Sequence, residues 1–153
     1  MPHISGKRVL AIASGGGHWE QLMLLRPAWV DAEVHYATTL KGLAKRAELH
    51  NAHYIPDCNR DEKLNIVRSA TAITALLLRI RPKVIVTTGA LPGLIAVMIG
   101  KRLGARTAWI DSFANVEEMS LAGQRAHRHA DLWISQWPSV AELVGAEHAG
   151  SLL

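Results

Sequence analysis

The chain has 153 residues, of which 49% are apolar and 20% are charged, so it is long enough for one domain with a core and too apolar for a disordered segment. Its net charge of +4 favours a phosphate ligand or an acidic membrane surface. One Phe and two Tyr residues offer no aromatic platform for RNA, so we expect no nucleic-acid partner. Cys58 is the single cysteine, which excludes an internal disulfide.

The sequence predicts neither a membrane-spanning helix nor a signal peptide. The longest uncharged stretch, residues 84–100, is interrupted by Gly89, Pro92 and Gly93 and falls short of the roughly 20 residues that a spanning helix needs. Residues 1–7 contain no apolar core of the kind that a signal peptide has. Any attachment to a membrane is therefore expected to be peripheral.

Apolar runs and turn residues predict strands and helices that alternate along the chain. Asp61 and Ser120 are expected helix N-caps, and Pro27 and Pro82 follow the ends of two helices. The expected elements are, in chain order, strand 7–13, helix 18–26, strand 34–38, helix 40–50, strand 53–55, helix 61–80, strand 84–88, helix 94–103, strand 106–110, helix 120–129, strand 132–135 and helix 138–144.

This alternation predicts an α/β fold. We expect a single Rossmann-like domain over residues 1–153, with a parallel sheet of about six strands and helices on both faces. Such sheets bind their ligands beyond the carboxyl ends of the strands. The segments expected at that edge are 14–18, 89–93, 111–118 and 136–138, together with Thr39.

The first of these segments reads Ser14-Gly15-Gly16-Gly17-His18 and joins a strand to a helix. Glycine lets a ligand approach the backbone amides, and a helix N-terminus favours anions, so we predict a phosphate or diphosphate seat. The alternative is a bare turn. The segment does not match a dinucleotide fingerprint, because Glu20 stands at the third glycine position and Thr38 and Thr39 end the second strand in place of an acidic residue. It also lacks the Gly-Lys-Ser/Thr of a P-loop, so we expect no cofactor.

Two polar side chains at this edge are candidates for chemistry. His18, beside a diphosphate, can donate one hydrogen bond or accept a proton, and the alternative is that it only caps its helix. Asp111 ends the fifth expected strand and could take a proton from a hydroxyl nucleophile. The alternative for Asp111 is a carboxylate that accepts backbone hydrogen bonds in its own turn.

No metal site is expected. The pairs His50 with His53 and His127 with His129 each lack a third ligand, and no cysteine pair supports them. Trp137, directly before a proline, could face a ligand or another protein, because aromatic residues are common at interfaces. A place in the core is the alternative for this side chain.

The second half of the chain carries three further elements in a fixed order. They are Ser112-Phe113-Ala114-Asn115-Val116, then Ser120-Leu121-Ala122-Gly123, then Ala130-Asp131 followed by Gln136-Trp137-Pro138. With the glycine segment, they closely resemble the Alg-fourteen-type oligosaccharide biosynthesis proteins, which include bacterial exopolysaccharide relatives of the PssD type. The resemblance covers almost the whole chain. It implies the N-terminal half of a GT-B glycosyltransferase of the MurG type, on a chain of its own.

The resemblance also implies roles for individual residues. The catalytic residues would be His18 and Asp111, the latter standing where the family usually has Glu. Asn115 and Gln124 replace a usual Arg and Lys, which removes positive charge. The expected acceptor or phosphate contacts are Ser14, Gly15, Gly16, Gly17, Gly89, Ser112 and Asn115. The residues expected to dock on the partner are Trp137, Ser151, Leu152 and Leu153.

The implied function is that of a subunit of a two-component, membrane-associated glycosyltransferase in polysaccharide biosynthesis. This chain would hold a polyprenyl-diphosphate-linked acceptor at the cytoplasmic face of the membrane. A donor-binding subunit would complete a heterodimer and bring a UDP-sugar of the UDP-GlcNAc or UDP-glucuronate type, and the chain alone would be inactive. Two alternatives remain, a scaffold that only recruits and activates the partner, and a small nucleotide-binding Rossmann protein.

Overall fold

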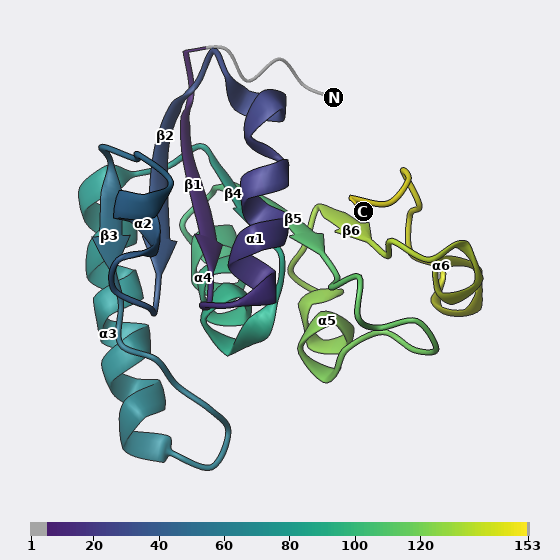
Figure 1. Cartoon of the computed structure of the whole chain (residues 1–153). Helices are drawn as coiled ribbons and strands as arrows, with labels where there is room; N and C mark the ends of the chain where they lie inside the picture. Colours follow the sequence, from purple (N-terminus) through teal and green to yellow (C-terminus); the bar gives the residue numbers. More distant parts are fainter. Residues whose placement is uncertain (1–5, 153) are drawn as a thin grey trace.

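A six-stranded parallel sheet forms the centre of the computed structural model, which describes residues 6–152 (Figure 1). The sheet order is β3-β2-β1-β4-β5-β6, and each pair of neighbouring strands runs parallel. The predicted α/β class and Rossmann-like parallel sheet are confirmed. The strands are β1 (Arg8–Ala13), β2 (Glu33–Thr38), β3 (Ala52–Tyr54), β4 (Val84–Thr87), β5 (Arg106–Ile110) and β6 (Leu132–Ile134).

Helices cover both faces of this sheet. Alternate side chains of β1 separate the two faces: Val9 and Ala11 pack in the cluster that contains Trp19 of α1, whereas Leu10 and Ile12 pack in the cluster formed with α3 and α4. The two clusters give the domain a core on each side of the sheet. The helices are α1 (Gly17–Leu24), the short 3₁₀ helix η1 (Arg26–Trp29), α2 (Leu43–Arg46), α3 (Lys63–Ile80), α4 (Ala90–Arg102), α5 (Leu121–Ala126) and α6 (Pro138–Val144).

The expected helix over residues 40–50 is wrong in extent, because only Leu43–Arg46 is helical. Gly42 precedes it with φ +90°, and Glu48 follows with φ +54°. Both residues adopt left-handed backbone conformations, which interrupt a right-handed helix. Asp61 is not the N-cap of α3 as expected, since the helix begins at Lys63 without a side-chain cap.

The expected loop over residues 89–93 is also wrong, because α4 begins at Ala90. Pro92 fits there, since a proline in the first turn of a helix gives up an N–H that has no partner within the helix. The expected cap at Ser120 is confirmed: its Oγ accepts a hydrogen bond from the Gly123 amide at 2.9 Å. The remaining strand and helix predictions match within a few residues at each end.

Two glycines of α4 allow this helix to lie directly against the sheet. A Cβ atom at Gly93 would overlap the side chain of Thr87, and one at Gly100 would overlap Ile85. The helix therefore has no room for larger residues at either position, and these two glycines set the close packing distance between α4 and β4. In the described part of the chain, no helix is long and apolar enough to cross a membrane.

A chain of polar side chains ties β2 and β3 to α3. Arg79 donates from Nη2 to His53 Nδ1 at 3.0 Å, and the rings of His53 and His35 stack with Nε2 of the first 3.1 Å from Nδ1 of the second. His35 Nε2 then lies 3.2 Å from Glu33 Oε1. Because Arg79 can only donate and Glu33 can only accept, the chain is satisfied when both imidazoles are neutral.

This hydrogen-bonded network from Arg79 to Glu33 predicts that the stability of the fold depends on pH. Burial, then the nearby His35 and Arg79, lower the pKa of His53 below its usual 6.5. The unfolded chain therefore binds a proton at this ring more readily than the folded chain does. The contribution of neutral His53 to the free energy of unfolding should be fully present above pH 6.5 and should be lost progressively as the pH drops below that value.

Urea unfolding at pH 7.5 and at pH 5.5 measures the effect. We expect a lower unfolding free energy at the lower pH, and a smaller difference in His53→Gln. His50→Gln serves as a control, because His50 is exposed. An equal pH dependence in His53→Gln and the wild type would contradict this assignment.

Candidate functional site

The carboxyl ends of β1 and β4 form the topological switch point of the sheet, where the order of the strands reverses. The chain leaves β1 for β2 on one side, and it leaves β4 for β5 on the other side. The helices that follow, α1 and α4, begin directly after these two strands. In open α/β sheets, ligands bind in the crevice at this place.

His18 joins the starts of the two helices. Its Nδ1 lies 2.9 Å from the Thr88 carbonyl oxygen, and because a carbonyl only accepts, Nδ1 carries the hydrogen. In return, Thr88 Oγ1 donates to the His18 carbonyl at 2.5 Å. Nε2 has no hydrogen bond to any residue of the range 6–152, so this nitrogen is left for a ligand.

Gly89 is placed against this ring. A Cβ atom there would lie 2.7 Å from His18 Cε1, and the residue has φ +129°. Both observations require glycine, because any side chain would displace the imidazole. The next residue, Ala90, also has a left-handed backbone, with φ +66°. A non-glycine residue in this conformation is strained, and such strain gathers at functional sites.

The glycine segment leaves amides accessible at the start of α1. Gly16 is the N-cap residue with φ +72°, and no side chain caps the helix. Gly16 and Gly17 are exposed, whereas the Gly15 amide donates to Thr39 Oγ1 at 3.2 Å. Ser14 Oγ lies 3.5 Å from the Gly15 carbonyl, too far for a strong hydrogen bond. The arrangement leaves the first amides of α1 open to an anion.

Asp111 is buried and fully hydrogen-bonded, with 2% of its surface exposed. Its Oδ1 accepts from Trp109 Nε1 at 3.0 Å and from Ser120 Oγ at 2.5 Å. Its Oδ2 accepts from Asn115 Nδ2 and from the Ser120 amide, both at 2.9 Å. These donors occupy the acceptor positions of the carboxylate, so the geometry favours the interpretation of Asp111 as the organiser of its own loop.

A buried amide pair that sequence reasoning missed connects this loop to α1. Gln136 Nε2 donates to Gln21 Oε1 at 2.7 Å and to the Asp111 carbonyl at 2.9 Å. Gln21 Oε1 also accepts from the Phe113 amide at 3.0 Å, and its Nε2 donates to Ser112 Oγ at 3.1 Å. The sequence placed Gln136 at the ligand edge of the sheet, but the one signal for its partner was a glutamine on the buried face of α1, between Trp19 and Leu22.

Two of the residues expected to meet the partner, Trp137 and Leu152, lie close to this amide pair. Trp137 Nε1 donates to the Phe113 carbonyl at 2.7 Å, and the rings of the two residues are tilted by 36° with their centroids 4.9 Å apart. The Leu152 amide donates to Gln136 Oε1 at 2.9 Å, and Ser151 is exposed. Leu153 lies outside the described residues. Trp137 and Leu152 thus support the loop from within the chain.

A hollow of about 410 Å³ opens beside His18, between the loop that precedes α3 and the start of α5. Ser112 and Asn115, which were predicted from the sequence, line it together with Ser120. Sequence reasoning missed Arg60 and Arg125, which also line it, because nothing in the sequence marks two distant arginines as neighbours. The hollow thus combines polar side chains of the 111–120 loop and two arginines with an apolar lining that includes Leu91, Leu94 and Leu121.

Cys58 lines the same hollow but is a poor nucleophile. Burial is the main cause that raises the pKa of its thiol, and the nearby Asp57 and Glu62 add to it. The thiol is therefore protonated at neutral pH. Among residues 6–152, no group of three or more His, Cys, Asp or Glu side chains could hold a metal ion.

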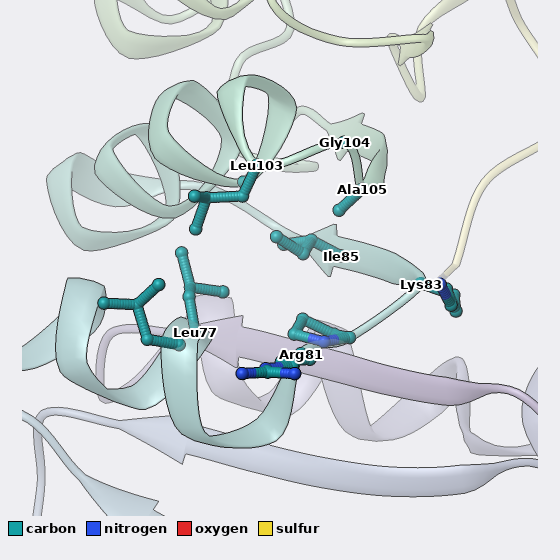
Figure 2. Close-up of a pocket in the computed structure, with 10 residues that line it drawn as sticks. Leu77, Arg81, Lys83, Ile85, Leu103, Gly104 and Ala105 are labelled. Atoms are coloured by element: carbon teal, nitrogen blue, oxygen red, sulfur yellow. The ribbon is translucent and has the colours of Figure 1, made fainter.

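A second hollow, of about 270 Å³, lies at the opposite ends of the strands (Figure 2). Leu77, Ile85 and Leu103 line its apolar wall, and Arg81 lies at its edge. It faces the amino end of β4, away from His18. None of the residues predicted to take part in function lines it.

No protein-family model matches the sequence, and no curated protein matches it. Solved structures match its fold. MurG from Acinetobacter baumannii has 13% identity and a TM-score of 0.71, over 88% of this chain and 43% of that protein. A UDP-N-acetylglucosamine 2-epimerase from Rickettsia bellii has 10% identity and a TM-score of 0.73, over 98% of this chain and 46% of the epimerase.

A glycosyltransferase from Rickettsia africae ESF-5 is also similar, with 9% identity and a TM-score of 0.60, over 86% of this chain and 37% of that protein. The chain spans less than half the length of each of these three proteins. Identities this low establish the fold alone, and the resemblance to the Alg-fourteen type stays a prediction. The chain has the fold of part of a GT-B-type protein such as MurG.

Proposed function

We propose that this chain is the acceptor-binding half of a glycosyltransferase and works with a donor-binding partner. The observation that carries the proposal is the pair formed by the exposed glycine amides and the open Nε2 of His18, at the crevice between β1 and β4. Amides at a helix start suit a phosphate group, and an unprotonated imidazole nitrogen suits a hydroxyl that must lose its proton. The GT-B-type fold is consistent with this role.

In this proposal, the partner brings a UDP-sugar, and the acceptor is a sugar on a polyprenyl diphosphate. An acceptor hydroxyl attacks the anomeric carbon, the bond from that carbon to UDP breaks, and UDP leaves with the bonding electrons. His18 Nε2 takes the hydroxyl proton. Its Nδ1–H stays on the Thr88 carbonyl, which keeps Nε2 as the accepting nitrogen.

A membrane surface is the second partner that we propose. Leu64 and Val67, at the start of α3, are 70% and 61% exposed. Lys63 and Arg68 lie on the same helix, and Arg60 lies just before it. Exposed apolar side chains flanked by basic ones suit peripheral attachment to an anionic leaflet, and the acceptor lipid would approach from there.

Ligand binding to the isolated chain tests the acceptor role. We expect it to bind farnesyl diphosphate, a soluble analogue of the lipid, with an affinity at least tenfold higher than for UDP-GlcNAc, as measured by calorimetry. The amides and the arginines of the hollow complement the diphosphate, whereas the donor pocket belongs to the partner. Tighter binding of UDP-GlcNAc would instead support a nucleotide-binding Rossmann protein.

Substitution of the imidazole tests the role of His18. In transferase assays with the donor-binding partner present, His18→Gln should lower kcat by about 100-fold or more, because it removes the proton acceptor. The exposed His50 supplies the matched control, His50→Gln, which should retain wild-type turnover. Normal turnover of His18→Gln, with association intact, would favour the scaffold alternative.

Asp111 should act on stability. Asp111→Asn places an NH₂ group against two of the donors that the carboxylate now satisfies, so we expect a loss of about 2–4 kcal/mol in urea unfolding. Glu117→Gln, in the same loop but exposed, should change stability by less than about 0.5 kcal/mol. An Asp111→Asn variant with normal stability and no turnover would restore Asp111 as the catalytic base.

A further inference from the structure

The hollow beside His18 continues into a larger groove. The groove has a volume of about 840 Å³, and it shares Arg60, Leu91, Leu94 and Arg125 with the hollow. Its floor is α4, which lies between α3 and α5 (Figure 1). A single elongated ligand can therefore pass from the hollow, between the two arginines, into the groove.

The two spaces offer different side chains to a ligand. Ser112, Asn115 and Ser120 give the hollow a polar side, which faces a ligand together with apolar residues such as Leu121. The groove has a continuous apolar strip along α4, where Ile95 and Met98 follow Leu91 and Leu94, and polar residues such as Gln124 lie beside it. A ligand that fills both spaces can place polar groups against the hydroxyl and amide side chains and an apolar tail along this strip.

Arg60 and Arg125 stand where the two spaces meet. The ion pairs of residues 6–152 involve Arg8, His35 and Lys101, so neither of these arginines has a carboxylate partner there. Two acidic groups near Arg60 in sequence are engaged elsewhere: Asp57 Oδ1 accepts from the Cys58 amide, and Glu62 Oε2 accepts from Asn65. Asp61, the direct neighbour of Arg60, forms no ion pair with it within residues 6–152. Two unpaired guanidinium groups at one junction suit a phosphate group.

We propose that Arg60 and Arg125 hold the lipid-side phosphate of a prenyl diphosphate, and that the first isoprene units lie in the groove over α4. The acceptor sugar then occupies the polar hollow, within reach of His18. This inference rests on the proposed function and adds to it a second anion contact and a path for the lipid. The arginines act by binding the substrate, and they take no part in proton transfer.

Calorimetric titration with inorganic pyrophosphate and with farnesyl diphosphate tests the assignment. Wild-type protein should bind farnesyl diphosphate more tightly, because only this ligand reaches the groove. Arg60→Gln and Arg125→Gln should each weaken both ligands by about tenfold. Met98→Gln, on the groove floor, should weaken farnesyl diphosphate by about fivefold and leave pyrophosphate unchanged.

Arg106→Gln is the matched control, since Arg106 is an exposed arginine at the start of β5, at the other end of the strands. It should bind both ligands as the wild type does, and thermal unfolding confirms that each variant is folded. If the wild type binds farnesyl diphosphate and both arginine variants do so equally well, the assignment is wrong and the proposed function stands. If the wild type binds neither ligand, both fail. Equal affinity of the wild type for the two ligands would exclude the groove as the lipid path.

Discussion

The buried carboxylate of Asp111 is the interaction on which the rest of the site depends. Its four hydrogen bonds join the end of β5, the loop that follows and the start of α5. Its own carbonyl accepts from Gln136, which reaches Gln21 on the opposite face of the sheet. One wall of the hollow and the position of α1 therefore depend on a single carboxylate. Since a buried carboxylate is costly unless all its hydrogen bonds are formed, this group holds its donors in place.

Around this wall, the candidate site combines backbone groups at helix starts with long charged side chains. The helix starts contribute backbone amides and one imidazole nitrogen, and the imidazole ring is held by a hydrogen bond to the Thr88 carbonyl. The long charged side chains are Arg60 and Arg125, from a loop and from a short helix. Backbone-anchored groups beside long arginine side chains would suit the proposed substrate, whose sugar must be placed accurately and whose lipid need not be.

Much of the fold was predictable from local signals. Runs of β-branched and apolar residues marked the strands, and Ser120 marked its helix by a capping bond that spans only three residues. The helix expected over residues 40–50 failed, because the left-handed conformations of Gly42 and Glu48 are not encoded by helix propensity alone. The loop expected at 89–93 failed because Pro92 is as compatible with a first helical turn as with a loop.

The sequence was enough to place the glycine segment and His18 at the edge of the sheet. It was not enough to predict the hydrogen bond between Gln21 and Gln136, which are 115 positions apart, or the presence of Arg60 and Arg125 in one hollow. No local pattern signals such distant neighbours. Ala90 carries the other hidden feature, a left-handed backbone on the wall of the hollow. Glycine would relieve about 1 kcal/mol there. It would also remove the Ala90 methyl group from the surface of the hollow. At this Cβ atom, a gain in folding stability would therefore come with a change in the shape of the hollow.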